Sequence, residues 1–94
     1  SNTIVYTIRW NVVKSARLKR IRGVSFEELI IGGKIINTID NPGRRGQHMF
    51  VFEYKQYIWI VPCVIEEENI FLKTLYPSRK YRKFYKKGVP SEKI

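Results

Sequence analysis

The stretch QHMFVFEYKQYIWIVPCVI, residues 47–65, decides the fold because it holds two strand-forming runs joined by a very short connection. Both runs are rich in β-branched and aromatic side chains, which favour strands. Only Lys55 and Gln56 separate Gln47–Tyr54 from Tyr57–Ile65, and a connection this short requires antiparallel pairing. The sequence therefore predicts an antiparallel hairpin in the middle of the chain.

Further strands are expected on both sides of this hairpin. Ile4–Trp10 alternates and is β-branched, and Lys34–Asp40 follows a pair of glycines. Asn69–Leu75 follows an acidic turn at residues 66–69. Together with the hairpin, these patterns predict five strands.

Three helices are expected, and each begins at a residue whose side chain can cap it. The first runs to about Arg22, the second is short because two glycines follow it, and the last covers Ser78–Lys87. A side-chain oxygen at the cap accepts from a backbone N–H of the first turn, and a Glu three residues later completes a capping box. The expected caps are Asn11, Ser25 with Glu28, and Ser78, and Gly23 ends the first helix.

The resulting order of elements is β-α-α-β-β-β-β-α. Early helices followed by hairpin strands indicate an α+β fold, with a mostly antiparallel sheet and the helices packed on one face. At 94 residues, 44% of them hydrophobic, the chain has the size and composition of one domain with its own core. We expect this domain to cover residues 3–88 and to be followed by a frayed tail of residues 89–94.

The positive charge of the chain is concentrated at its two ends. Eighteen Lys and Arg against eight Asp and Glu give a net charge of +10. Residues 1–26 carry six cations and no acid, and residues 70–94 carry eight cations and one acid. A surface that serves solubility alone mixes both signs, so this asymmetry indicates a polyanionic partner, most often nucleic acid. If the two ends converge in the fold, they form one continuous positive surface.

The last helix shows this charge in its most organised form. Helical spacing puts its cations on one face and the aromatic residues Tyr81, Phe84 and Tyr85 on the other. The helix can therefore dock by its aromatic side and present its cations outward. With cations of the first helix and of the loop after Asp40, it predicts an RNA-binding surface. The predicted members of this surface are Arg17, Arg20, Arg44, Arg45, Arg82, Lys83 and Lys86.

The sequence offers few residues for metal or thiol chemistry. Cys63 is the single cysteine, and its apolar neighbours indicate a buried, unreactive thiol. No Cys/His metal set and no phosphate-binding glycine-rich loop is present, so we expect neither a metal nor a cofactor. The sequence has no signal-peptide pattern and no apolar run long enough to span a bilayer, which predicts a cytoplasmic protein.

Two groups of residues resemble BrnT-type toxins of type II toxin–antitoxin systems, over most of residues 8–87. The first is Trp10-Asn11 followed by GVSFEE at residues 23–28, and the second is IFLKT at residues 70–74 followed by PSRK at residues 77–80. The resemblance implies a RelE-like fold and a small bacterial ribonuclease toxin. It also implies a cognate antitoxin protein with a ribbon-helix-helix DNA-binding part. Many members of the family carry Lys-His-Gly where this chain has Ile21-Arg22-Gly23.

Cleavage of RNA without a metal requires that a 2′-hydroxyl lose a proton, that the phosphorane charge be stabilised and that the 5′-oxygen gain a proton. Arg79 is the candidate for charge stabilisation, because a guanidinium at a helix start binds phosphate oxygens in bidentate fashion. Lys73 can act as a base or neutralise charge, and Tyr76 can supply a hydroxyl or stack on a base. His48 is the only histidine, a residue type suited to acid–base catalysis.

The sequence therefore predicts a metal-independent endoribonuclease toxin that binds RNA and is neutralised by a cognate antitoxin. Two other classes of protein share the same features. A non-catalytic nucleic-acid-binding module needs the same charges but no proton-transfer group. A protein-interaction domain would use its basic face to recognise an acidic partner.

Overall fold

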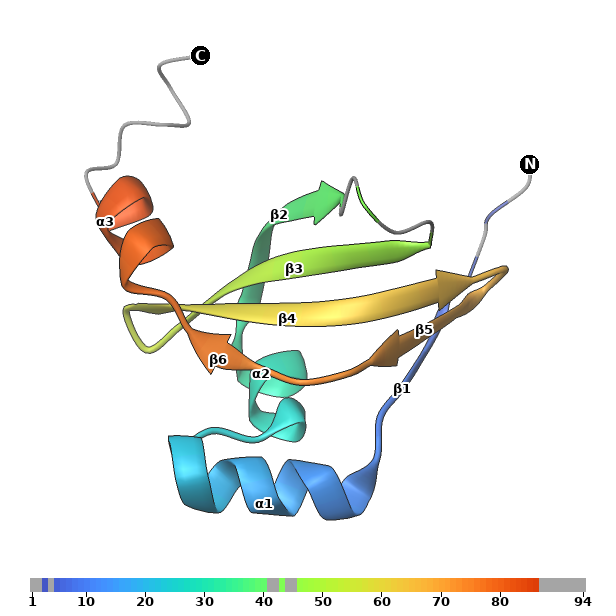
Figure 1. Cartoon of the computed structure of the whole chain (residues 1–94), viewed down its shortest axis with the longest axis horizontal. Coiled ribbons are helices and arrows are strands. Elements are labelled where there is room, and N and C mark those ends of the chain that lie inside the picture. The colour runs from blue at the N-terminus through green and yellow to red at the C-terminus, as the bar shows by residue number, and fades with distance from the viewer. Residues whose placement is uncertain (1–2, 4, 41–42, 44–45, 87–94) are drawn as a thin grey trace.

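The computed structural model describes residues 3, 5–40, 43 and 46–86, and for residues 84–86 it describes the backbone only. Within these residues, six strands form one sheet and three helices pack around it (Figure 1). The α+β fold with a mostly antiparallel sheet is confirmed. The strands are β1 (Thr7–Arg9), β2 (Lys34–Asp40), β3 (Gln47–Tyr54), β4 (Tyr57–Glu66), β5 (Asn69–Leu72) and β6 (Tyr76–Pro77), and the helices are α1 (Val12–Arg22), α2 (Phe26–Gly32) and α3 (Arg79–Lys86).

The predicted hairpin β3–β4 lies at the centre of the sheet. The strand order is β1-β5-β4-β3-β2, with β1 parallel to β5 and the other pairs antiparallel. Lys55 and Gln56 at the tip have φ of 52° and 65°, as a tight two-residue hairpin turn requires. The two-residue strand β6 was not expected from the sequence. It forms because the chain rejoins β4 after a break, where Tyr76 pairs with Ile60.

The predicted helix caps are confirmed in α1 and α2. The Asn11 side chain accepts a hydrogen bond from Lys14 N at 2.9 Å, and Gly23 ends α1 in the left-handed conformation with φ of 86°. Ser25 and Glu28 form the capping box at the start of α2. None of the helices in the described residues is long and apolar enough to cross a membrane.

Glu27 ties the corner between β1 and α1 to helix α2. Its two carboxylate oxygens accept from Trp10 Nε1 at 2.9 Å and from the Ser15 hydroxyl at 2.5 Å. The Ser15 side chain is buried and in turn accepts from Phe26 N at 3.0 Å. The hydrogen bonds from Ser15 and then Trp10 lower the pKa of Glu27, because they stabilise its charged form.

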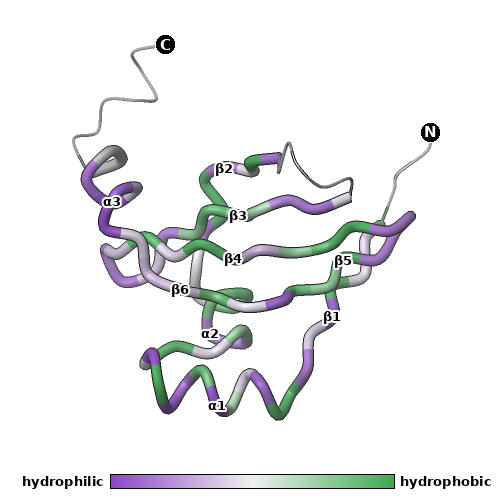
Figure 2. Tube along the Cα trace, viewed as in Figure 1, coloured by the Kyte–Doolittle hydropathy of each residue, from purple (hydrophilic) through white to green (hydrophobic). Residues whose placement is uncertain are grey.

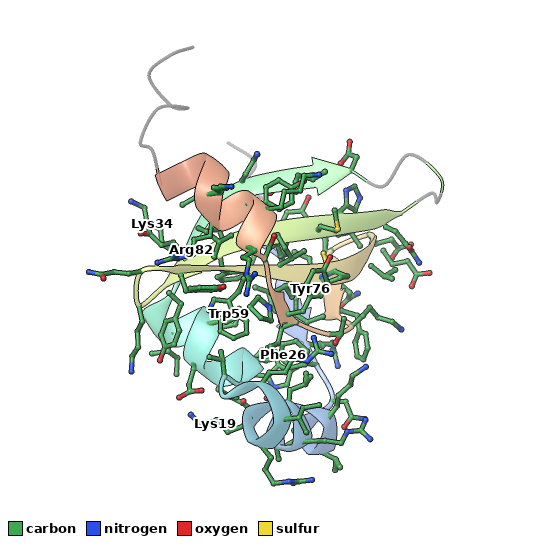
Figure 3. The ribbon with its side chains drawn as sticks, turned by 60° about the vertical axis from the view of Figure 1, so that its left-hand side comes forward. Lys19, Phe26, Lys34, Trp59, Tyr76 and Arg82 are labelled. Atoms are coloured by element: carbon green, nitrogen blue, oxygen red, sulfur yellow. The ribbon has the colours of Figure 1, made fainter. Side chains whose placement is uncertain are left out.

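The sheet is apolar on both faces because β4 is an almost continuous apolar run and the middle of β3, Met49–Phe52, is apolar as well (Figure 2). Alternate side chains, such as Phe52 and Trp59, point toward α1 and α2 and form the larger core with Phe26 (Figure 3). The intervening side chains point to the opposite face, where Tyr81 of α3 packs against them. This second, smaller cluster consists of Val51, Ile58 and Ile60.

The expectation that all helices pack on one face of the sheet is wrong for α3. Helices α1 and α2 cover one face, and α3 lies on the opposite face (Figure 1). Ser78 N donates to Ile58 O at 3.0 Å, so the chain is still held to β4 when α3 begins. The Tyr81 side chain packs on the apolar face that α1 and α2 leave uncovered.

The hydrogen bonds at Glu27 make the stability of the fold depend on pH. A carboxyl group whose folded-state pKa lies below its ordinary value of 4.5 stabilises the fold fully above that value. The contribution is lost as the pH falls through the lowered, folded-state pKa. We therefore expect the free energy of unfolding, measured by urea denaturation, to fall as the pH is lowered below the ordinary pKa of Glu27. Glu27→Gln should be less stable at neutral pH and should lose less stability on acidification.

The matched control for this experiment is Glu68→Gln, which removes a carboxylate from an exposed turn. Its unfolding free energy should follow that of the wild type at every pH. A Glu27→Gln variant with the full acid sensitivity of the wild type would show that this carboxylate does not hold the corner.

Candidate nucleic-acid interface

The sheet separates the cations of the first helix from those of the last. Arg17 and Arg20 are exposed on α1, and Arg79 and Lys83 are exposed on α3, on the other side of the sheet (Figure 1). The first and last helices therefore do not share one continuous positive surface, because the apolar strands β3 and β4 lie between them. Of the two basic ends, Arg9 and Lys73 do come together, on either side of Phe71. Of the other predicted RNA-binding residues, Arg44 and Arg45 lie outside the described residues, and so does the side chain of Lys86.

Two further cations of α1 are exposed but bind other parts of the fold. Lys19 Nζ donates to Glu28 Oε2 at 2.8 Å and to Gly23 O at 3.2 Å. Arg22 Nη1 donates to Leu75 O at 2.8 Å, in the segment that links β5 to β6. Both cations lie in the last turn of α1, where the helix dipole favours positive charge. They anchor α1 to its neighbours and are engaged before any ligand binds.

Helix α3 contacts the sheet through the neighbouring side chains of Tyr81 and Arg82. Ser78 caps it as predicted, since its hydroxyl accepts from Tyr81 N at 3.1 Å. Tyr81 packs on the sheet, and Lys83 is exposed. Arg82, expected to face outward, is instead half-buried with its guanidinium carbon 4.9 Å from the centroid of the Tyr57 ring (Figure 3). Its Nε is buried and has no hydrogen-bond partner among the described residues.

Beyond α3, the same face of the sheet is left open by the described part of the chain. Helix α3 packs near Ile58 and Ile60, whereas the side chains toward the other end of β4 on this face are half-buried or exposed. The cross-strand register fixes which residues share the face, because directly paired residues point the same way. We call this surface the open face. It consists of Arg9, Gln47, Met49, Pro62, Val64, Phe71, Lys73 and Tyr76.

Aromatic rings and cations alternate along one margin of the open face. Phe71 on β5 is 39% exposed and Tyr76 on β6 is 36% exposed. Lys73 Nζ lies 5.2 Å from the centroid of the Phe71 ring, and Arg9 on β1 is the cross-strand neighbour of Phe71. Exposed rings flanked by cations form a surface that suits single-stranded nucleic acid, whose bases stack on rings and whose phosphates pair with cations.

His48 lies on the opposite face of the sheet. It pairs in register with Cys63, which belongs to the core beneath α1 and α2. His48 Nδ1 lies 2.8 Å from Asp40 Oδ1.

Burial raises the pKa of the Cys63 thiol to about 11, so the thiol is protonated at neutral pH and the prediction of a buried, unreactive cysteine is confirmed.

Three of the four candidate catalytic residues lie along the segment that runs from the end of β5 through β6 to the start of α3. Lys73 and Tyr76 both lie on the open face, and Arg79 begins α3 directly after β6. All three are exposed and can meet the same bound strand. His48 is not among them. In the described part of the chain, no three His, Cys, Asp or Glu side chains are grouped as metal ligands would be.

Among the rings and cations of the open face, Arg9 and Phe71 were not predicted from the sequence. Residues 70–72 are all apolar, so their alternation between a buried and an exposed face is invisible until β5 is placed in the sheet. Arg9 joins Phe71 only through the parallel pairing of β1 with β5, which are distant in the chain. Lys73 was the one available signal for Phe71. Strand residues two positions apart share a face, so an exposed Lys73 would have predicted an exposed Phe71.

A comparison of the chain with protein-family models found no match, and a comparison with curated proteins found none either. The resemblance to BrnT-type toxins therefore rests on the quoted residues alone. Several of them have architectural roles in the structure: Asn11 and Gly23 cap α1, and Trp10 holds Glu27. This part of the motif specifies how α1 and α2 are joined to the sheet.

The division of charge between the two sides of the sheet predicts a matched pair of double variants. Arg9→Ala with Lys73→Ala removes two cations from the open face, and Arg17→Ala with Arg20→Ala removes two from α1. If single-stranded RNA binds the open face, the first pair should reduce the log–log salt slope of binding by about 1.4, roughly 0.7 for each phosphate that is no longer neutralised. The α1 pair should leave the slope unchanged, as measured by fluorescence anisotropy. A slope reduced only by the α1 pair would place the RNA on the other side.

Proposed function

We propose that this chain is an RNA-directed endoribonuclease, the toxin of a bacterial type II toxin–antitoxin pair acting in the cytoplasm. The observation that carries the proposal is the placement of Lys73, Tyr76 and Arg79 in one exposed segment at the margin of the open face. An RNA strand bound across Phe71 would pass these three side chains. The resemblance of residues 70–74 and 77–80 to BrnT-type toxins supports the same assignment.

In the proposed reaction, the 2′-oxygen of a ribose attacks the adjacent phosphorus and the bond to the 5′-oxygen breaks. The products are a 2′,3′-cyclic phosphate and a 5′-hydroxyl. Arg79 stabilises the charge on the phosphorane oxygens, and the Lys73 ammonium neutralises charge beside it. The Tyr76 hydroxyl donates a proton to the leaving 5′-oxygen and recovers one from water, while the 2′-hydroxyl proton passes to solvent. No metal takes part.

A cognate antitoxin would neutralise this activity by covering the cations of the open face with an acidic or amphipathic segment. Such a segment would match the net charge of +10. The ribbon-helix-helix DNA-binding part of the antitoxin is proposed from the resemblance to BrnT-type systems.

A non-catalytic nucleic-acid-binding module is the second candidate function. Two observations favour it: His48 lies on the far face of the sheet, and the three remaining candidates are exposed to water. Preorganised catalytic groups gain most of their strength from exclusion of water. The two functions share the RNA-binding surface and differ in whether the bound strand is cut.

The test is cleavage of a single-stranded RNA in the presence of EDTA. We expect the wild type to cut the RNA and Arg79→Ala to cut it about 100-fold more slowly, a typical loss for one group that stabilises transition-state charge. The melting temperature should not change, because the Arg79 side chain is exposed. Arg17→Ala makes the same charge change on α1 and should cut RNA at the wild-type rate.

The outcome also separates the two candidate functions. RNA that is bound and remains intact would identify the chain as the non-catalytic module. Equal cleavage by the wild type and by Arg79→Ala, prepared in the same way, would show that Arg79 is not part of an active site.

A further inference from the structure

Phe71 is the feature of the open face that the proposed reaction does not use. We propose that Phe71 stacks on a base of single-stranded RNA, with Arg9 and Lys73 pairing with the phosphates on either side of that base. The inference rests on the RNA-binding part of the proposed function and is independent of cleavage. It makes Phe71 a positioning residue, which fixes where the strand lies relative to Lys73, Tyr76 and Arg79.

The exposure of Phe71 follows from the way the sheet is covered. Its neighbours Ile70 and Leu72 are buried beneath α1 and α2, so Phe71 points to the other face. Residues that pair directly across the strands form rows that cross the sheet. Helix α3 packs on the rows of Ile58 and Ile60. Phe71 pairs with Val64, which lies four residues after Ile60 on β4. The ring therefore projects from a rigid strand that is paired on both sides, by β1 and by β4. A ring held in this way loses little conformational entropy when a base stacks on it.

The exposed ring of Phe71 beside two cations favours RNA over an acidic peptide as the occupant. On this side of the sheet Glu53 pairs with Ile58, far from the ring, whereas Glu66 pairs with Asn69, in the row next to that of Phe71 and Arg9. An acidic peptide would satisfy the cations but would leave the ring without a flat partner. A nucleotide supplies both a phosphate and a base with a π face.

A second ring on the same face makes the proposal more specific. Tyr76 lies beside Ile60, and Phe71 lies beside Val64, so their backbone positions are about 13 Å apart at roughly 3.3 Å per strand residue. The two rings therefore contact different nucleotides of one strand, with Lys73 between them.

The test uses an RNA octamer with 2′-O-methyl riboses, which lacks the attacking hydroxyl and stays intact. One central base is 2-aminopurine, whose fluorescence falls when it stacks on an aromatic ring. We expect the wild type to quench this fluorescence. Phe71→Leu should bind about 5- to 150-fold more weakly with loss of the quenching, which corresponds to roughly 1–3 kcal/mol for one stacked base. Phe71→Trp should retain both, and the salt slope of Phe71→Leu should equal that of the wild type.

Ile35→Ala is the matched control, because Ile35 is exposed on β2 and pairs with Phe52, on the other side of the sheet. It should bind the octamer as the wild type does. Thermal melting of Phe71→Leu and Phe71→Trp checks that both fold. Wild-type affinity and quenching in Phe71→Leu would overturn the stacking contact while leaving RNA binding intact.

Two other results would also overturn the proposal. No binding of the octamer by the wild type, together with no cleavage of unmodified RNA, would remove the proposed function as well. Tight binding of polyglutamate that is lost in Phe71→Leu, without binding of the octamer, would assign the open face to an acidic protein partner.

Discussion

The central strands β3 and β4 carry apolar side chains on both faces of the sheet, and the rest of the structure follows from the need to cover both. Helices α1 and α2 cover the face that holds Phe52 and Trp59. The opposite face exposes the cluster of Val51, Ile58 and Ile60 unless another element packs there. Burying three such side chains is worth about 5–9 kcal/mol, which is comparable with the whole stability of a small domain. Helix α3 therefore has to cross to this second face.

The short length of α3 then determines where a ligand can bind. Tyr81 covers the cluster at one end of β4, and the described residues leave the rows toward the other end open. On those rows the sheet presents a ring and cations where a buried sheet would present only aliphatic side chains. The face that α1 and α2 cover is buried in the core. Glu27 holds these two helices together by accepting hydrogen bonds from Trp10 and Ser15. The cations of α1 and α3 consequently act on separate surfaces.

Local signals in the sequence predicted local structure well, because a cap or a tight turn depends on residues that are adjacent in the chain. Asn11, Gly23 and the Ser25–Glu28 box fall where they were expected. The positions of charges were predicted less well, because they depend on which face each element covers. The prediction that one face of the sheet is covered overlooked the unbroken apolar run Ile58–Val61, a pattern typical of strands buried on both faces. The pairing of β1 with β5, which places Arg9 beside Phe71, joins segments about sixty residues apart and leaves no local signal.

The most direct test of this account is the face of the sheet that single-stranded RNA contacts. Backbone amide chemical shifts, followed by NMR during titration with the uncleavable octamer, report that face residue by residue. We predict that the largest changes fall on β1, β5, β6 and the start of α3, around Arg9, Phe71, Lys73 and Tyr76. Changes centred on Arg17 and Arg20 of α1, with β5 unaffected, would contradict it.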